Sequence, residues 1–234
     1  MQQYFAKNKN LDLEDGDYHH IKNVMKMKCG DLIKVVYDNV IYTCKLNNVS
    51  NKSTFDIINK EEKTDKKLSV SVAFSLIKEQ KLNYLLQKTT ELGVNKLIPI
   101  ETKRSVVKIE GNKEKTKIDR WKKICKEASE QSFRADIPEI SGILTLKNLV
   151  NLDYDLKLVC SLNKNTKNIK KILEKNNKCV KILLVVGPEG GFDPLEEEYL
   201  LENGFKSVSL GENVLRAETA PVVALSMINY EFMR

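Results

Sequence analysis

The sequence predicts an α/β protein with a small β-rich region at its N-terminus. From Ser69 onward, apolar strand patterns alternate with amphipathic helix patterns, the order expected of a mostly parallel sheet with helices on both faces. Before Ser69 the strand patterns follow one another with only a short helix among them. The polar stretch KEEKTDKK at 60–67 separates the two patterns. We therefore expect a β-rich domain over 1–68 and an α/β domain over 69–234.

Two strands of the N-terminal region are predicted by their composition and by the turn between them. Residues Leu32–Tyr37 and Val40–Leu46 are rich in β-branched and aromatic side chains. Asp38 and Asn39, which separate them, are a two-residue hairpin signal. Residues 54–59 predict a further strand. We expect these elements to form a small β-barrel.

A short helix is expected before this hairpin. Asp17 can accept hydrogen bonds from the free backbone N–H groups of a first turn, and Gly30 is suited to end the element. The apolar face of this helix is expected to comprise Ile21, Val24 and Met25.

The α/β region alternates strands and helices to the end of the chain. Residues 180–186 (VKILLVV) are apolar almost throughout and predict a strand buried on both faces, as in a parallel sheet. Further strands are expected at residues 69–76, 97–100, 156–162 and 205–210. Helices are expected up to Leu92, at 116–132, around Ile169 to Leu173, from Asp193 to Gly204, and at 218–233. Thr116 and Asp119 are expected in capping positions of the second of these helices.

Composition excludes several classes of protein. No stretch approaches the roughly 18 apolar residues of a membrane-spanning helix, and the first residues lack the apolar core of a secretory signal. The five cysteines form no CxxC motif and cannot all pair with one another, which favours a cytoplasmic protein. His19 and His20 are too few and too isolated for a zinc site, so no metal is expected.

Basic residues are concentrated in one segment. Residues 103–126 contain ten basic side chains against Glu110, Glu114 and Asp119, and this excess of seven equals the net charge of the chain, +7. Such a patch suits a polyanion such as RNA, although a solvated lysine-rich surface would have the same composition. Arginine is rare in this lysine-rich chain. The arginines that remain are therefore expected at positions that need a planar guanidinium, which lysine cannot replace; the five are Arg104, Arg120, Arg134, Arg216 and Arg234.

A glycine-rich loop, GPEGGF at 187–192, follows the most hydrophobic strand. It has neither the GxGxxG nor the GxxxxGK[ST] pattern of phosphate-binding loops, and it contains no lysine. The helix that follows begins with Asp193 and Glu196, whose carboxylates would repel a pyrophosphate from the helix N-terminus. A neutral or cationic ligand held by backbone groups fits better, and a purely structural turn at Gly190 or Gly191 stays an alternative.

A second loop, LGENVLRAETA at 210–220, follows the next strand. Arg216 and Glu218 lie here between a short apolar run and a helix start. A structural role is open for both, because Glu218 suits a first turn and Arg216 could pair with a nearby acid. Ligands of parallel sheets bind at the carboxyl ends of the strands, so two such loops on successive strands favour a binding site.

These motifs, taken in order, resemble the RsmE family, the bacterial 16S ribosomal RNA uridine N3-methyltransferases of the SPOUT class. The resemblance covers nearly the whole chain, and it rests on the ordered set of motifs at these spacings, which ends with the two glycine-bearing loops. Its other motifs are His19-His20 to Gly30-Asp31, Lys88 with Glu91-Leu92-Gly93-Val94, Arg104-Ser105-Val106-Val107, Arg120-Trp121, and Glu127-Ala128 with Gln131-Ser132, Arg134 and Pro138.

The resemblance implies a PUA-like RNA-binding barrel at 1–68 and a SPOUT methyltransferase domain at 69–234, with a C-terminal trefoil knot within about 156–234. It further implies a homodimer that binds S-adenosyl-L-methionine (SAM) in the knot and acts on the small ribosomal subunit at the decoding region. The cofactor-binding residues by analogy are Leu162, Gly187, Pro188, Glu189, Gly190, Gly191, Leu210, Gly211, Leu215 and Arg216. The RNA-binding residues by analogy are Lys88, Arg104 and Arg134.

Methylation of uridine at N3 requires that a proton leave the nitrogen and that negative charge on the neighbouring oxygens be stabilised. We expect Arg216 to stabilise this charge and Glu189 to accept the proton, with Glu218 or the other subunit as an alternative acceptor. Three other functions are kept in view: methylation of ribose 2′-O or of another RNA site, a catalytically inactive RNA-binding module, and a nucleotide-dependent enzyme, which the missing phosphate loop disfavours.

Overall fold

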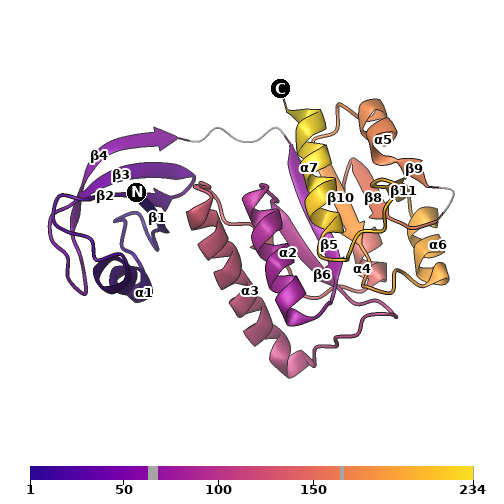
Figure 1. The fold of residues 1–234 in the computed structure, drawn as a ribbon, viewed down its shortest axis with the longest axis horizontal. Coiled ribbons are helices and arrows are strands. Elements are labelled where there is room, and N and C mark those ends of the chain that lie inside the picture. The colour runs from indigo at the N-terminus through magenta and orange to yellow at the C-terminus, as the bar shows by residue number, and fades with distance from the viewer. Residues whose placement is uncertain (63–67, 164–165, 234) are drawn as a thin grey trace. The chain divides into compact units, whose positions relative to one another are not determined.

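The computed structural model describes residues 1–62, 68–163 and 166–233, and they form two compact units (Figure 1). One unit comprises Met1–Asp65 with Lys126–Ile137, and the other comprises Lys66–Cys125 with Pro138–Arg234. The expected boundary segment at 60–67 lies outside the described residues from position 63 onward. Helix α3 (Gly111–Gln131) contributes its first part to the second unit and its last turns to the first.

The first unit is built on a four-stranded sheet in the order β1-β2-β3-β4. Strand β2 is antiparallel to β3, and β3 to β4, whereas β1 joins β2 in parallel. The hairpin between β2 and β3 turns at Asp38 and Asn39, both with positive φ (48° and 60°), as its sequence predicts. The described residues show no pairing of β1 with β4, so they form an open sheet and not the closed barrel expected. The strands are β1 (Gln2–Phe5), β2 (Leu32–Tyr37), β3 (Val40–Leu46) and β4 (Phe55–Glu62).

The short N-terminal helix differs from its prediction. Helix α1 (Asp15–His19) continues directly into the π-helix η1 (His20–Val24), and the chain leaves the helix there and not at Gly30. Its N-cap is Glu14; Asp17 lies in the first turn, where its carboxylate accepts a hydrogen bond from the Glu14 backbone N–H at 3.3 Å in a capping box. Of the expected apolar face only Ile21 is buried, and Val24 and Met25 are exposed. The turn here is a π-helix, which does not keep the spacing of an α-helical face.

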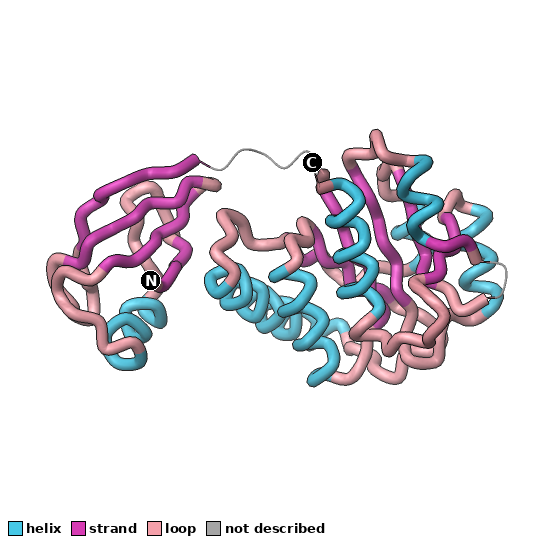
Figure 2. Tube along the Cα trace, turned by 45° about the horizontal axis from the view of Figure 1, so that its top comes forward, coloured by secondary structure: helices cyan, strands magenta, loops and turns pink. Residues whose placement is uncertain are grey.

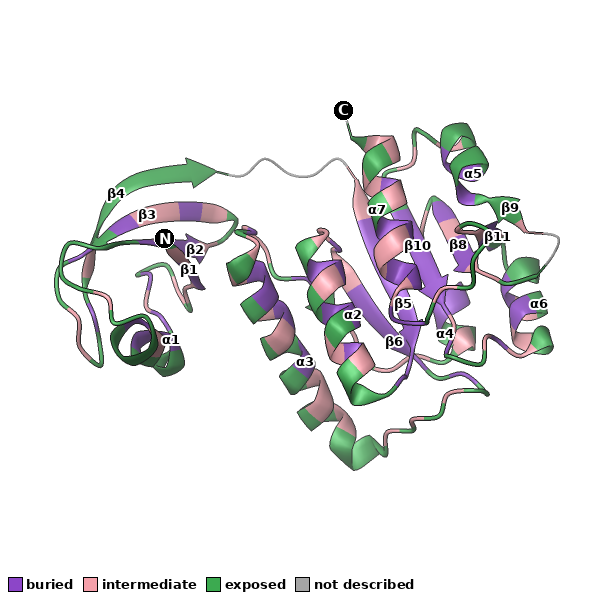
Figure 3. Ribbon diagram, viewed as in Figure 1, coloured by how far each residue is buried: buried purple, intermediate pink, exposed green. Residues whose placement is uncertain are grey.

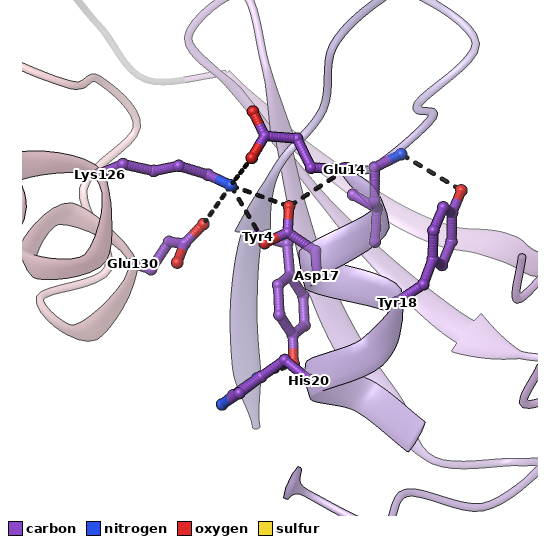
Figure 4. Close-up of polar contacts among 8 residues, drawn as sticks. Tyr4, Glu14, Asp17, Tyr18, His20, Lys126 and Glu130 are labelled. Carbon is purple, nitrogen blue, oxygen red and sulfur yellow. Dashed lines mark hydrogen bonds and ion pairs between the residues drawn. The ribbon is translucent and has the colours of Figure 1, made fainter. Parts of the chain in front are cut away.

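Residues 126–137 contact strand β1 and helix α1 of this unit, although they come from far along the chain. Successive strand residues point to opposite faces, so Tyr4 lies in the unit's apolar core while Gln3 faces the other side. There the Gln3 side-chain amide, 2% exposed, donates to the Arg134 carbonyl at 2.6 Å. The Lys126 ammonium lies 2.9 Å from Asp17 and 3.1 Å from Glu14, in a cluster that also contains Tyr4 (Figure 4).

The second unit is a seven-stranded sheet in the order β7-β6-β5-β10-β8-β11-β9, and every pair in it is parallel. The expected parallel α/β architecture is thus confirmed. Strand β10 lies at the centre and is buried from its second residue onward, as its continuous apolar sequence predicts (Figure 3). The strands are β5 (Ser69–Ser75), β6 (Lys96–Ile100), β7 (Glu139–Ile140), β8 (Leu156–Cys160), β9 (Lys167–Asn168), β10 (Lys181–Val186) and β11 (Lys206–Ser209).

Helices cover both faces of this sheet (Figure 2). Alternate strand residues divide between two apolar clusters: Leu184 of β10 packs with helices α2, α3, α5 and α7, and its neighbour Val185 packs with α4 and α6. The remaining helices are α2 (Glu79–Glu91), α4 (Leu146–Val150), α5 (Ile169–Lys175), α6 (Pro194–Glu202) and α7 (Ala220–Phe232). No helix in the described part of the chain has the length and apolar character needed to cross a bilayer.

Several element ends differ from their sequence prediction. Helix α3 begins at Gly111, so Thr116 and Asp119 lie inside it and not at its cap. A long-range contact anchors the extra first turn, because the Glu114 carboxylate accepts from the Ile143 backbone N–H at 2.9 Å. Strand β8 ends at Cys160, which leaves Leu162 in a loop and 70% exposed. The short elements β1, β7, β9 and α4 carry too little periodicity for the sequence to predict them.

Candidate active site

A cavity of about 800 Å³ opens at the carboxyl ends of the central strands of the second unit. Three loops line it: residues 161–163 after β8, residues 187–192 after β10, and residues 210–217 after β11. Strands β10, β8 and β11 are neighbours in the sheet, so their carboxyl ends bring these loops together although the loops are far apart in sequence. The cavity lies where ligands of parallel sheets bind.

All ten residues expected to bind the cofactor line this one cavity; they are Leu162, Gly187, Pro188, Glu189, Gly190, Gly191, Leu210, Gly211, Leu215 and Arg216. Sequence analysis missed other lining side chains, among them Lys81, Asn163, Glu197 and Asn213. Lys81 has no local signal, because it comes from the first turns of α2 and reaches the cavity only because β5 lies beside β10. Among the described residues, no group of three His, Cys, Asp or Glu side chains could bind a metal ion.

The GPEGGF loop has a backbone that requires glycine at two positions. A Cβ on Gly187 would come within 3.1 Å of the Phe192 ring and 3.2 Å of the Phe192 backbone nitrogen, closer than a methyl group normally packs. Gly191 has φ +68°, a conformation that L-residues adopt only with strain, and its N–H donates to the Pro188 carbonyl at 2.9 Å. The loop is therefore a tight turn that leaves backbone, with few side chains, against the cavity.

The N-terminus of helix α6 has no free N–H groups of its first turn to offer an anion. The Asp193 side chain accepts from the Leu195 N–H at 3.2 Å, and the Glu196 carboxylate accepts from the Asp193 N–H at 3.1 Å. These two contacts form a capping box, and they place the carboxylates expected at this helix start where a phosphate would otherwise bind. The absence of a phosphate-binding helix end follows from these contacts and not only from a missing motif.

Lys103 and Arg104 bind the glycine-rich loop and the start of α6 through hydrogen bonds and an ion pair. The Arg104 guanidinium donates to the Gly190 carbonyl at 3.1 Å, and the Lys103 ammonium lies 3.2 Å from Asp193. The Lys103 backbone N–H also donates to Glu196 at 2.8 Å. Arg104, which was expected to bind RNA, thus lines the cavity and holds a carbonyl of its wall.

Glu189 faces the cavity in an ion pair. Its Oε1 lies 3.0 Å from the Lys81 ammonium, and both side chains are about two-thirds buried, 27% and 33% exposed. Burial raises the pKa of the Glu189 carboxyl. Hydrogen bonds from its own backbone N–H and from Lys81 lower the pKa, and together the lowering effects are larger, so the pKa is below its ordinary value. Glu189 is therefore ionised at neutral pH and a weaker proton acceptor than an isolated carboxylate.

Arg216 and Glu218 are not paired with each other in the described structure. Arg216 is exposed on the cavity wall, and no carboxylate among the described residues lies within ion-pair distance of its guanidinium. Its carbonyl accepts from the N–H groups of Thr219 and Ala220 at 2.9 Å, which fixes the loop at the start of α7. Glu218 is 8% exposed, and its Oε2 has no hydrogen-bond partner within the described part of the chain. Among the described residues that line the cavity, Arg216 is the cation with no carboxylate at ion-pair distance.

The two other arginine and lysine residues expected to bind RNA lie outside the cavity. Lys88 is on α2 and pairs with Glu91 at 2.8 Å. The Arg134 side chain is 6% exposed and donates to Asp136 at 2.5 Å, so its guanidinium is engaged within the first unit. The position of Arg134 indicates an organising role for the loop that carries it.

The basic segment at 103–126 is only partly neutralised by nearby acids. Glu79 pairs with Lys117 at 2.9 Å and with Arg120, and these two cations lower the pKa of its carboxyl to about 2. Lys122 and Lys123 on α3 are exposed, with no ion pair in the described structure. A basic surface therefore persists on α3.

Comparison with known proteins agrees with this geometry. Residues 64–229 match the family model described as an RNA methyltransferase domain, and residues 13–58 match the RNA methyltransferase PUA domain. The chain is 35% identical to ribosomal RNA small subunit methyltransferase E of Bacillus subtilis over 99% of its own length and 97% of that protein's.

Two solved structures extend the similarity to the fold. A Legionella pneumophila protein solved with bound SAM superimposes with a TM-score of 0.89 and 28% identity, over 98% of this chain and 97% of the other. Ribosomal RNA small subunit methyltransferase E of Neisseria gonorrhoeae, also bound to SAM, gives a TM-score of 0.88 and 25% identity over the same shares, 98% and 97%. The cavity at the strand ends, the two matched domains and the full-length similarity together show that the chain belongs to the ribosomal RNA small subunit methyltransferase E family, a family of SAM-dependent RNA methyltransferases.

Proposed function

We propose that this protein transfers a methyl group from SAM to N3 of a uridine in 16S ribosomal RNA, in the decoding region of the small ribosomal subunit. The observation that carries the proposal is the single cavity formed by the three loops after β8, β10 and β11, with the unpaired Arg216 on its wall. The names of the relatives, ribosomal RNA small subunit methyltransferase E, support the substrate.

The residues of the cavity fit SAM. Its volume of about 800 Å³ lies within the range of sites for small cofactors. Its wall includes the glycine-bearing loops after β10 and β11, whose backbone groups can hydrogen-bond an adenosine without repelling the positive charge of a sulfonium. Glu197 adds a carboxylate that is 9% exposed and whose Oε1 has no partner among the described residues. No phosphate-binding helix end is offered, which fits a cofactor without phosphate.

The loop residues would hold the cofactor mainly through backbone groups. Gly187 to Gly191 from one loop and Leu210, Gly211 and Leu215 from another line the cavity, and Leu162 lines it from the third loop. When bound, SAM supplies an activated methyl group on a sulfonium. The protein must then bring the uridine base within reach and manage the proton and charge of N3.

Arg216 is suited to stabilise negative charge on the uracil ring. Loss of the N3 proton leaves charge on the two flanking carbonyl oxygens, which a planar guanidinium can contact through two N–H groups. Because no carboxylate of the described chain engages Arg216, it needs no rearrangement of an ion pair to do so. We assign Arg216 this electrostatic role.

We assign Glu189, in its ion pair with Lys81, as the acceptor of the N3 proton. The carboxylate is available to accept the N3 proton only in its ionised form, and the contact with Lys81 favours that form by lowering the pKa. Glu218 and groups of a second subunit are alternative acceptors.

The finer features of the family are part of the same proposal. We propose a PUA-like RNA-binding domain over 1–68, a SPOUT domain over 69–234 and a C-terminal trefoil knot within about 156–234. A homodimer in the cytoplasm is proposed on the same basis. The RNA is expected to contact Lys88, Arg104 and the basic surface of α3.

The test is transfer of tritium-labelled methyl groups from SAM to small subunits and to naked 16S RNA, both from cells that lack the modification, followed by nucleoside analysis. Label in 3-methyluridine is the expected result, and the better acceptor identifies the substrate state. Label in a 2′-O-methylated or other nucleoside would overturn the assigned reaction. Absence of SAM binding would favour an RNA-binding module without activity.

A further inference from the structure

Phe133 has a backbone conformation that suits glycine and not a large side chain. Helix α3 ends with the Arg134 N–H donating to the Ser129 carbonyl at 3.0 Å and the Phe133 N–H reaching the Glu130 carbonyl at 3.4 Å. These two bonds form a Schellman motif in which Phe133 is the left-handed residue, with φ +54°. A phenylalanine is strained there, whereas glycine or asparagine would not be.

The ring of Phe133 gains little from burial in return for this strain. Phe133 stays 46% exposed, although the adjacent loop is firmly anchored. Arg134 beside it is buried, its guanidinium bound to Asp136 and its carbonyl to the Gln3 amide. The surrounding contacts therefore hold the aromatic ring at the surface instead of enclosing it.

The exposed ring lies beside unneutralised lysines. The Lys34 ammonium is 5.2 Å from the ring centroid, a cation–π contact. Leu32, two residues earlier on β2, points to the same face and is 42% exposed, and Lys45 faces Leu32 across the β2–β3 ladder. Neither lysine has an ion pair within the described part of the chain, although Asp56 lies opposite Lys45 on β4.

We propose that Leu32, Lys34, Lys45 and Phe133, here called the Phe133 patch, bind an unpaired nucleotide of the RNA, with its base stacked on the Phe133 ring and its phosphates near Lys34 and Lys45. A flat exposed ring binds bases of any sequence, and nearby ammonium groups neutralise the phosphates. Single-stranded RNA fits better than duplex, because a paired base does not offer its face.

The patch is composite, since the matched PUA domain covers 13–58 and does not contain Phe133. The ring comes from the segment 126–137, which belongs in sequence to the matched RNA methyltransferase domain but folds into the first unit. The inference rests on the proposed function in that the RNA is its substrate, and it adds a binding position for one unpaired nucleotide.

The experiment measures binding of full-length protein to a fluorescein-labelled oligouridylate of about 12 nucleotides and to an RNA duplex of the same length, by fluorescence anisotropy. Phe133→Gly removes the ring and suits the local φ, so it is expected to fold at least as stably as wild type. It should weaken oligouridylate binding about 5- to 150-fold and change duplex binding less than about twofold. Phe133→Trp should retain or increase affinity.

The lysines are tested by the salt dependence of binding. Lys34→Gln should lower the slope of log affinity against log salt by about 0.7, the value for one phosphate contact on a single strand. Lys9→Gln, an exposed lysine elsewhere in the first unit, should leave the slope unchanged. Equal affinity of wild type and Phe133→Gly for oligouridylate, or equal losses in Phe133→Gly and Phe133→Trp, would overturn the proposal.

A second readout separates this inference from the proposed reaction. With 16S RNA as acceptor, Phe133→Gly should raise KM for RNA and leave kcat and SAM affinity unchanged. If wild type transfers no methyl group to 16S RNA, the proposed function fails, whereas the oligouridylate titrations still decide whether the patch binds RNA.

Discussion

The Lys81 ammonium lies 3.0 Å from Oε1 of Glu189 on the wall of the cavity. This pair joins the first turns of α2 to the glycine-rich loop after β10, two segments that only the parallel pairing of β5 with β10 brings together. Because burial alone would raise the pKa of Glu189, the lysine contributes to keeping the carboxylate charged. The lowered pKa of the candidate proton acceptor thus depends in part on a residue that no motif marks.

Replacing Lys81 is expected to shift the acid limb of activity. Lys81→Met removes the hydrogen bond and the charge that lower the pKa of Glu189, while burial continues to raise it. The pKa therefore rises, and the acid limb of kcat/KM moves to higher pH if ionised Glu189 is required. Lys96→Met, which breaks an exposed pair with Glu139, is the matched control. An unchanged pH profile in Lys81→Met would show that Glu189 is not the acceptor.

Loss of the Arg216 guanidinium is expected to slow chemistry more than cofactor binding. Arg216→Ala should reduce the single-turnover methylation rate about 100- to 1,000-fold, as removal of a charge-stabilising donor does in other enzymes. Arg216→Lys should recover only part of this rate, because an ammonium lacks the paired donor geometry. SAM affinity, measured by calorimetry, should fall less than the rate. Intact single-turnover methylation in Arg216→Ala would contradict the assigned role.

The tight turn at Gly187 is expected to control cofactor affinity. In Gly187→Ala the new methyl group meets the Phe192 ring at 3.1 Å and the Phe192 backbone at 3.2 Å, so the loop must move. Because the same backbone lines the cavity, SAM affinity should fall about tenfold or more, equivalent to about 1.4 kcal/mol. Gly111→Ala, where no atom lies within 4 Å, serves as control and should bind SAM normally. Equal affinities in both variants would argue against the loop as a binding wall.

The stability of the first unit is expected to depend on the protonation of Glu130. This side chain is 14% exposed on α3, near Lys126 and Asp17 (Figure 4). Burial raises the pKa of its carboxyl to about 7, Asp17 adds to the shift, and Lys126 opposes it. The folded state then binds the proton more tightly than the unfolded chain, whose value is 4.5.

The free energy of unfolding therefore falls as pH rises through this range. The stabilisation is complete below pH 4.5 and is lost as pH rises to about 7, a change of about 3 kcal/mol. Glu130→Gln keeps an acceptor for the Phe5 backbone N–H and cannot ionise, so it should not lose stability over this pH range. Its free energy of unfolding should therefore exceed that of wild type at pH 8 by more than it does at pH 5. Urea unfolding at the two pH values measures it. Glu127→Gln, at an exposed position on the same helix, should show no such difference.

Local sequence signals were sufficient wherever the structure depends on neighbours in the chain. The turn at Asp38 and Asn39, the apolar strand β10 and the helix start at Asp193 all follow from a few adjacent residues, and each is present as predicted. The same signals failed at α1 and at the start of α3. At α1 the cap is Glu14, and Asp17, expected as the capping residue, is its partner within the first turn. At α3 the extra first turn is held by the contact of Glu114 with Ile143, a long-range contact that local preference does not contain.

The sequence by itself determined the alternation of strands and helices, the parallel sheet and the two glycine-bearing loops. These features depend on the hydrophobic periodicity and the backbone preferences of residues that are adjacent in the chain. Only the tertiary structure decided that residues 126–137 join the first unit, that Lys81 meets Glu189 and that Phe133 stands beside Lys34. Each of these depends on which distant segments pair or pack. Such pairings are set by the sum of many weak contacts over the whole chain, and no single stretch of sequence carries them.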